Sequence, residues 1–298
     1  MIWMHNLRTL TLRQKVILLN TFITAKVWYI SSILPSQSVH TAKLTAAMGK
    51  FLFRGLPARV SMQQLACNIE KGGLKLQIKS KALFVNRHQQ ELDSLPFYQT
   101  LLVQNIPPPT DIPCLKLLSQ QIPLLPRNIQ QNPTSDRIYD LYLNQIELRR
   151  VERNQPGLNW RKIWTNISSR ALTSSQRSDL YLLVNEKTDH RVLASIIGRA
   201  EDPTCQHCMV DNETIQHKFS ECPRVTMAWA YMKRKLTSIL GGWQRLSFDE
   251  LLRPVLNNIT IEKKNEILKL FIKYTNFIKL SVTNPIDEGE LDFNSNLE

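Results

Sequence analysis

The sequence has few of the features that mark membrane or secreted proteins. No apolar run reaches the ~20 residues that a membrane-spanning helix needs, because Arg13, Lys15 and Lys26 interrupt the most hydrophobic segment. Five cysteines are too few for a disulfide scaffold, and the N-terminal segment has no signal-peptide cleavage site. These absences predict a protein without a membrane partner, in a reducing intracellular compartment, which is the cytoplasm, the nucleus or both.

The signature motifs of several enzyme classes are absent as well. The nine glycines form no phosphate-binding Gly-x4-Gly-Lys loop, and neither Gly-x-Ser-x-Gly nor His-Glu-x2-His occurs. The chain has no Asp-Asp pair, so it lacks the adjacent carboxylates that hold two metal ions in a polymerase. The sequence therefore predicts no catalytic residues and no small-molecule substrate.

The positive charge is abundant and unevenly distributed. The net charge is +13, and residues 1–100 carry 13 basic against 3 acidic side chains, whereas residues 201–298 carry 12 against 14. Clustered Lys and Arg neutralise phosphates and release counterions, so the N-terminal excess favours RNA or DNA as partner over the alternative of solvated helix faces. The residues expected to contact phosphate are Arg8, Arg13, Lys15, Lys26, Lys43, Lys50, Arg54 and Arg59.

Apolar periodicity predicts a mainly α-helical fold with an N-terminal helical region over residues 1–94 and a C-terminal one over 134–283. In the first region we expect one long helix ending at Pro35, a second helix near 38–53, and a turn at Gly72 and Gly73. A further helix is expected to begin near Ser80. In the second region helices are expected over 135–153, 160–169, from the capping box of Thr173 and Gln176 onward, 225–240 and 261–281.

Two segments have a composition that is unfavourable for helices or for a packed core. Residues 95–133 contain more than half of the chain's 15 prolines, which favour extended backbone, and are expected to form a linker. Residues 284–298 carry five acidic and no basic side chains and are expected to be a disordered acidic tail.

One motif has a spacing that is specific for metal binding. Cys205, Cys208, His217 and Cys222 form the pattern Cys-x2-Cys-x8-His-x4-Cys, which can supply four ligands to a tetrahedral zinc ion. A full protein ligand set leaves no open position, so the prediction is one structural Zn²⁺. The alternative is three small buried cysteines and a surface histidine. His207, between the first two cysteines, is expected to be exposed and outside the ligand set.

The same region carries a resemblance to a known family. The segments WRKIW, LTSSQRSDLYLL, DPTCQHC, ETIQHKFSECP and MAW, between residues 160 and 229, resemble the zinc-binding segment of reverse transcriptases from non-LTR (LINE-type) retrotransposons. LRQKVILLNTFITAKVWYISSILP, KFLFRG and GGLKL are similar to the thumb of the same proteins. The resemblance implies a thumb-like basic region over 1–94 and a zinc-binding knuckle within about 160–230.

The family resemblance also implies a function. The chain would be a non-catalytic C-terminal fragment that grips template–primer and element RNA or target DNA during target-primed reverse transcription, alongside the remainder of a retrotransposon polyprotein. It would not be an enzyme on its own, because the palm Asp pair and a nuclease domain are missing. Two alternatives stay open: a domesticated or relic protein-interaction module stapled by zinc, and a decayed reading frame without function. Salt-sensitive binding to nucleic acid distinguishes the first interpretation from the others.

Overall fold

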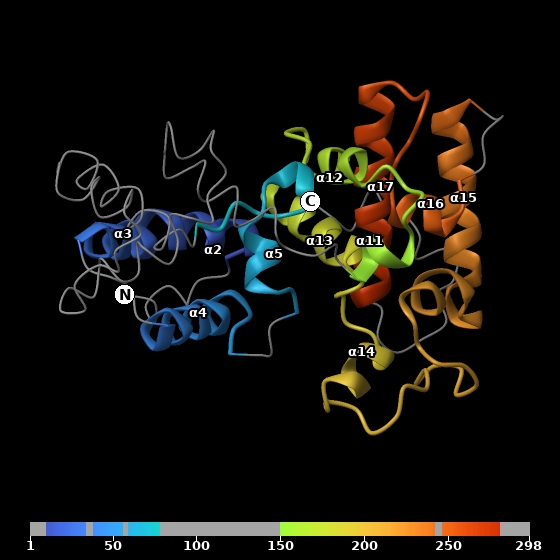
Figure 1. Ribbon diagram of the computed structural model, residues 1–298. Coiled ribbons are helices and arrows are strands. Elements are labelled where there is room, and N and C mark those ends of the chain that lie inside the picture. Colours follow the sequence, from blue (N-terminus) through green and yellow to red (C-terminus); the bar gives the residue numbers. More distant parts are fainter. Residues whose placement is uncertain (1–9, 34–37, 56–58, 78–149, 242–245, 281–298) are drawn as a thin grey trace. The chain divides into compact units, whose positions relative to one another are not determined.

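The computed structural model of the chain describes residues 10–33, 38–55, 59–77, 150–241 and 246–280 (Figure 1). Within these ranges the fold is mainly α-helical, which confirms the predicted fold class, and the β-type pairing is confined to an isolated antiparallel bridge between Thr204 and Asn212. Among these residues we find no helix with both the length and the apolarity to cross a membrane.

Several predictions concern residues outside the described ranges. These are the helix expected from Ser80, the linker over 95–133, most of the helix over 135–153, and the acidic tail over 284–298. The described residues belong to two compact units. Two short N-terminal segments, Thr11–Arg13 and Ile69–Gly72, belong to the second unit together with the chain that follows Arg149.

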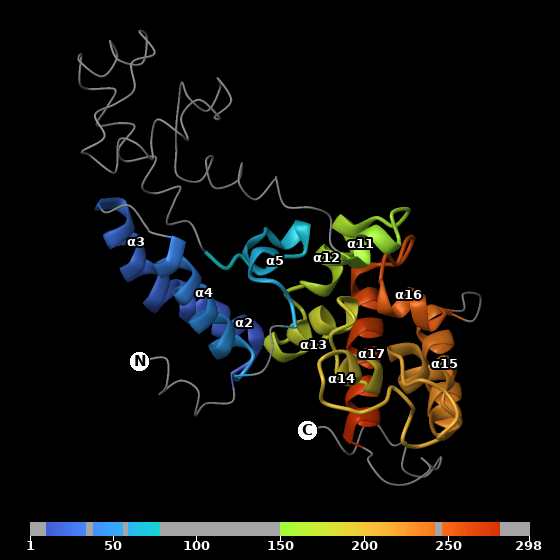
Figure 2. The same cartoon turned by 60° about the horizontal axis from the view of Figure 1, so that its bottom comes forward.

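The N-terminal unit is built on two helical segments that lie side by side in both views (Figures 1 and 2). The first is the predicted long helix, but its middle is π-helical: α2 (Leu12–Leu18) continues through η1 (Leu19–Thr24) into α3 (Ala25–Ile33). The second, α4 (Ser38–Leu52), matches its predicted range closely. Their buried side chains form the core of this unit and include Val16, Leu19, Met48, Phe51 and Leu52.

A tight turn follows these helices, as the glycine pair predicts. The short helix α5 (Met62–Ala66) begins at Ser61, whose hydroxyl accepts the N–H of Gln64. The chain then passes η2 (Ile69–Lys71) and reverses, so that the N–H groups of Leu74 and Leu76 both donate to the carbonyl of Leu65 at 2.9 Å.

The C-terminal unit packs several helices around α17 (Ile261–Leu280), the longest helix of the described chain. Figure 1 shows α17 between α13 and α15, and it contacts both. The capping box predicted at Thr173 and Gln176 is present at the start of α13. The helices of this unit are α11 (Arg150–Asn154), α12 (Trp160–Ile167), α13 (Ser174–Val184), α14 (Arg191–Ile196), α15 (Thr226–Leu240), α16 (Phe248–Leu252) and α17.

Aromatic side chains fill the core of this second unit. Trp164 is fully buried, and its indole N–H donates to the Glu152 carboxylate at 2.9 Å. Tyr274 of α17 donates its hydroxyl to the backbone carbonyl of Phe219 at 2.5 Å. Burial raises the pKa of Tyr274, so this hydroxyl keeps its proton and remains a donor. The segment around Phe219 is therefore fixed to the longest helix.

Candidate metal centre

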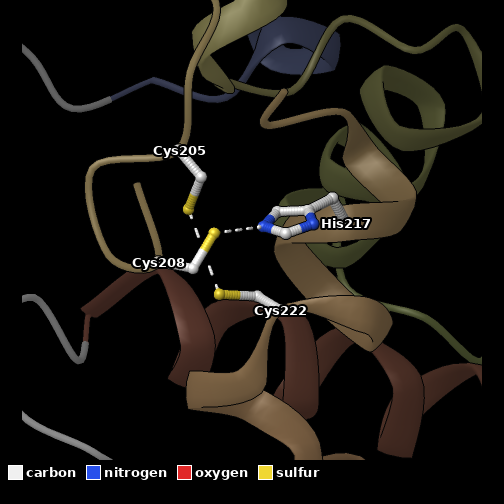
Figure 3. Close-up of side chains that lie close together, drawn as sticks. All are labelled: Cys205, Cys208, His217 and Cys222. Carbon is white, nitrogen blue, oxygen red and sulfur yellow. Dashed lines mark hydrogen bonds between the residues drawn. The ribbon is translucent and has the colours of Figure 1, made fainter. Parts of the chain in front are cut away.

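The four residues of the cysteine and histidine motif converge on one point (Figure 3). One ligand atom from each of them lies within 4.8 Å of all the others. Cys205 Sγ is 3.9 Å from Cys222 Sγ, and Cys208 Sγ is 3.4 Å from His217 Nε2. Cys205, His217 and Cys222 are buried, and Cys208 is half-buried. The convergence indicates a possible metal site.

Two of these separations, between the Sγ atoms of Cys205 and Cys222 and between Cys208 Sγ and His217 Nε2, match a tetrahedral zinc site. With Zn–S near 2.3 Å and Zn–N near 2.0–2.1 Å, tetrahedral geometry places two sulfurs about 3.8 Å apart and a sulfur and a nitrogen about 3.5 Å apart. Both observed separations lie within about 0.1 Å of these values. Three thiols and one imidazole are also the donor types that zinc prefers, so the residues fit the ion.

The first two ligands are presented by a short closed loop. The bridge between Thr204 and Asn212 joins its ends, and the N–H of Cys205 donates to the carbonyl of Asp211 at 2.8 Å. Inside the loop, Met209 adopts a left-handed conformation with φ of 54° and donates its N–H to the Cys205 carbonyl at 3.0 Å. The reversal turns both thiols toward the same point.

The second pair of ligands depends on a π-helical turn. His217 begins η4 (His217–Glu221), and Cys222 follows it directly and donates its N–H to the His217 carbonyl at 2.8 Å. Five residues of α-helix rotate a side chain by about 500°, which would leave the two ligands roughly 140° apart. The wider turn, closed by a bond between residues five apart, brings them to one side. The His-x4-Cys spacing thus suits this geometry.

Cys208 and Cys222 differ in how readily they ionise. Backbone N–H groups of Asp211 and Val210 donate to the thiol of Cys208 and lower its pKa to about 7. Burial raises the pKa of Cys222 to about 11. Cys208 is thus substantially a thiolate near neutral pH, whereas Cys222 would lose its proton on binding a metal.

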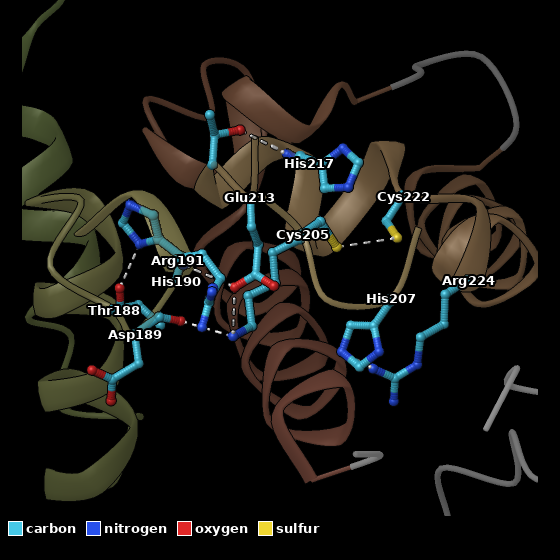
Figure 4. A network of polar contacts seen from close by, with 12 residues as sticks. Thr188, Asp189, His190, Arg191, Cys205, His207, Glu213, His217, Cys222 and Arg224 are labelled. Carbon is cyan, nitrogen blue, oxygen red and sulfur yellow. Dashed lines mark hydrogen bonds and ion pairs between the residues drawn. The ribbon is translucent and has the colours of Figure 1, made fainter. Parts of the chain in front are cut away.

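Polar contacts anchor the ligand segment to its surroundings (Figure 4). Thr214 accepts the N–H of His217 at 3.0 Å and thereby caps the turn. The buried carboxylate of Glu213 accepts the N–H of Arg191 at 3.0 Å and lies 3.4 Å from the ammonium of Lys218. Lys218 also donates to the carbonyl of Asp189 at 2.9 Å. This network ties the loop over residues 204–212, called the metal loop below, to the start of α14.

The network was missed by sequence reasoning. Glu213 and Thr214 belong to the segment ETIQHKFSECP, but no spacing in the sequence indicates that the Glu213 carboxylate is buried beside the proposed metal ligands. His207 is exposed, as predicted, and its Nε2 lies 2.6 Å from Arg224 Nη1. Cys67 is buried and does not belong to the cluster, and Cys114 lies outside the described residues.

The basic residues predicted to contact phosphate have different environments. Lys26, Lys43, Lys50 and Arg54 are exposed, Arg59 is half-buried, and Arg8 lies outside the described residues. The prediction that Arg13 contacts phosphate from the N-terminal region needs a correction. Arg13 belongs to the second unit, and its guanidinium donates to the Ser168 hydroxyl at 2.8 Å. Burial lowers its pKa to about 10.

The prediction that Lys15 contacts phosphate needs the largest correction. Its side chain is only 3% exposed, and its ammonium donates to the carbonyls of Phe51 and Leu52 at 2.9 and 3.1 Å. Burial, together with the charge of Arg54, lowers the pKa of Lys15 to about 8. These carbonyls end α4 and have no partner within the helix, so Lys15 caps that helix end and is not available to phosphate.

We expect Lys15→Met to destabilise the N-terminal unit by about 1–3 kcal/mol, because two buried carbonyls lose their donor while the side-chain volume is kept. Urea denaturation of the full chain measures this, with Lys43→Met at an exposed position as the control. Equal midpoints for the two variants would show that Lys15 does not cap α4.

The comparisons with known proteins add no family. The chain matches no protein-family model and no curated protein sequence. The geometry of the cluster therefore supports metal binding, and the retrotransposon resemblance rests on the residues quoted above.

Proposed function

We propose that the chain is a nucleic-acid-binding, non-catalytic C-terminal part of a non-LTR retrotransposon reverse transcriptase, with one structural zinc ion in its C-terminal unit. The observation that supports nucleic-acid binding is the charge of the N-terminal unit. Its described residues include no Asp or Glu but seven cationic side chains: Lys15, Lys26, Lys43, Lys50, Arg54, Arg59 and Lys75. Where the described residues carry cationic groups and no acidic ones, the surface that they form repels cations and attracts a polyanion.

Zinc would act here as a covalent-like cross-link. Cys205, Cys208, His217 and Cys222 would hold it and leave no position for water or substrate, so it would stabilise the fold without supplying catalysis. It would join the loop closed by Thr204 and Asn212 to the turn η4.

The phosphate contacts belong on the N-terminal unit. Residues 201–213, which include the metal loop, carry Glu201, Asp202, Asp211 and Glu213 and no Lys or Arg. Three thiolates and one Zn²⁺ add a further net charge of −1. Such a segment repels phosphate at short range, so we assign it a supporting role and assign binding to the described basic residues of the N-terminal unit.

A salt series tests the assignment. The triple variant Lys26→Ala, Lys43→Ala, Lys50→Ala is expected to bind a single-stranded oligonucleotide with a smaller slope of log affinity against log salt, reduced by about 2, since each lost phosphate contact removes about 0.7. Fluorescence anisotropy from 50 to 300 mM KCl measures the slope. The matched control carries Lys233→Ala, Lys263→Ala and Lys269→Ala, three exposed lysines of the other unit, and has the same net charge.

Two outcomes would contradict the proposal. Equal slopes for both triple variants would mean that the N-terminal unit is not the contact surface. Absence of binding by the unmodified chain at 50 mM salt would favour the second candidate, a zinc-stapled protein-interaction module.

That candidate is supported by Met209 and Val210, which are 71% and 79% exposed at the tip of the acidic metal loop. Exposed apolar side chains at such a tip are typical of protein contacts.

A further inference from the structure

A cavity of about 770 Å³ lies in the C-terminal unit, lined by residues of α16 and of the segment that precedes α12. Its apolar surface is formed by Leu158, Leu246, Val255, Leu256 and Ile259. Ligand pockets typically have volumes of roughly 300–1,000 Å³ and apolar walls with a few well-placed polar groups. The cavity shares no residue with the metal cluster, so it is a separate feature of this unit.

One wall of the cavity is fixed by hydrogen bonds and by its backbone geometry. The side-chain amide of Asn166 donates to the carbonyls of Pro254 and Val255 at 2.7 and 3.1 Å. Leu256 and Asn258 have left-handed φ angles of 45° and 58°, a conformation that leucine rarely adopts. Such strain persists only where the surrounding structure imposes it, and it is concentrated at binding sites. The wall is therefore formed before any ligand arrives.

Two asparagine side chains at the cavity are oriented by Lys162. Asn159 Oδ1 accepts the backbone N–H of Lys162 at 3.0 Å, and Asn257 Oδ1 accepts its ammonium at 2.5 Å. These bonds leave the Nδ2 groups of both asparagines without a hydrogen-bond partner among the residues that the structure describes. The cavity thus has two oriented N–H₂ donors for the carbonyl groups of a ligand.

Two carboxylates line the cavity from the first turn of α16. Asp249 Oδ1 accepts from Arg253 Nη1 at 2.8 Å, and Glu250 Oε2 accepts the N–H of Ser247 at 2.8 Å. The second oxygen of each carboxylate has no partner within the described ranges. Arg253 is the one cation among the described lining residues, and it also pairs with Glu186. One positive charge is thus shared among three carboxylates, and the cavity is negatively charged.

We propose that this cavity binds a basic peptide segment of a partner protein, with an apolar side chain in the cavity and a Lys or Arg on the two carboxylates. Peptide carbonyls would accept from Asn159 and Asn257, and the cation would donate to Asp249 and Glu250. Charge-assisted hydrogen bonds of this kind are about twice as strong as neutral ones and select a partner of complementary charge.

The charge of the cavity argues against nucleic acid as its occupant. A phosphate beside Asp249 and Glu250 would be repelled by both, and the guanidinium of Arg253 is already paired. The inference is independent of the nucleic-acid binding proposed for the N-terminal unit, because it assigns a protein partner to the other unit.

The experiment measures the binding of labelled peptides to the full chain by fluorescence anisotropy. The probe is a pool of six-residue peptides that alternate Lys or Arg with Leu, Ile or Val. The double variant Asp249→Asn, Glu250→Gln removes both charges but keeps an oxygen that can accept the bonds from Arg253 and Ser247. It is expected to bind the pool at least about tenfold more weakly.

The matched control is Glu201→Gln, Glu266→Gln, which removes two exposed carboxylates outside the cavity and gives the same net charge. Its affinity for the basic pool should stay within about twofold of that of the unmodified chain. Two further pools separate the charge from the apolar contact, one with Glu in place of the cations and one with Ser in place of the apolar residues. Both should bind the unmodified chain at least about fivefold more weakly than the basic pool.

Three results would overturn the inference. The first is no binding of the basic pool, or equal binding of the basic and acidic pools. The second is equal affinity of the two double variants for the basic pool. The third is weaker binding of a 12-nucleotide single strand by the Asp249 and Glu250 variant, which would assign the cavity to nucleic acid. We expect that variant to bind the strand at least as tightly as the unmodified chain, because it loses two negative charges.

Discussion

Replacing Cys208 with serine is expected to abolish stoichiometric zinc binding and to unfold the loop over residues 204–212. The ion is proposed to join this loop to η4, and within residues 204–212 the only buried residue is Cys205, which is itself a proposed ligand. Structural zinc contributes on the order of 10 kcal/mol to the folding of small metal-dependent modules, so a loop held mainly by zinc cannot remain ordered without it. Zinc content per chain, measured on the purified protein, should fall from one to near zero.

The loss of order should be graded along the segment. Phe219 is fully buried, stacks on Phe248 and accepts the hydrogen bond of Tyr274, so the turn that carries His217 has contacts that do not depend on metal. The loop that carries Cys205 and Cys208 has fewer contacts of this metal-independent kind. Amide hydrogen exchange of Cys208→Ser, or of the chain treated with a chelator, should therefore accelerate over 204–212 far more than over 217–221.

Cys67→Ser is the control for this experiment. Cys67 is buried in the N-terminal unit, where its thiol donates weakly to the Gln63 carbonyl at 3.5 Å, and it lies outside the cluster. The variant should keep one zinc per chain and normal exchange over 204–222. Full zinc content in Cys208→Ser would remove the cluster from consideration as the metal site, and the second ligand pair would then need another explanation.

The convergence of Cys205, Cys208, His217 and Cys222 could be predicted from sequence because the information is local. Two ligand pairs at short spacing specify both the donor types and their approximate geometry, and the capping box of α13 is encoded within four residues in the same way. The π-helical turns η1 and η4 could not be predicted by periodicity, because apolar spacing in a short segment does not distinguish α from π geometry.

Long-range contacts account for the remaining differences. Lys15 looks like any surface lysine in sequence, and only the approach of the end of α4, 36 residues later, turns it into a buried cap. Glu213 likewise acquires its role from Arg191 and from Lys218, which meet it only in the folded unit. A count of charges cannot make this distinction, and the predicted phosphate contacts therefore included two residues, Arg13 and Lys15, whose side chains have structural partners.

Gly73→Ala is expected to lower the stability of the N-terminal unit by at least about 3 kcal/mol. A Cβ atom at this position would lie 1.8 Å from the carbonyl oxygen of Cys67, and a backbone atom cannot move aside as a flexible side chain could. The turn would have to open, which would break the bonds from Leu74 and Leu76 to the Leu65 carbonyl and expose two buried leucines.

Gly49→Ala supplies a control of opposite sign in the same unit. Gly49 lies inside α4, where an added Cβ would meet no atom closer than Met62 Sδ at 4.0 Å, so the substitution should raise stability by up to about 1 kcal/mol through helix propensity alone. Urea denaturation of both variants measures the difference directly. If Gly73→Ala were as stable as the unmodified chain, the close approach of residues 67 and 73 would be wrong, and with it the reason that the glycine pair precedes the short segment Leu74–Leu76.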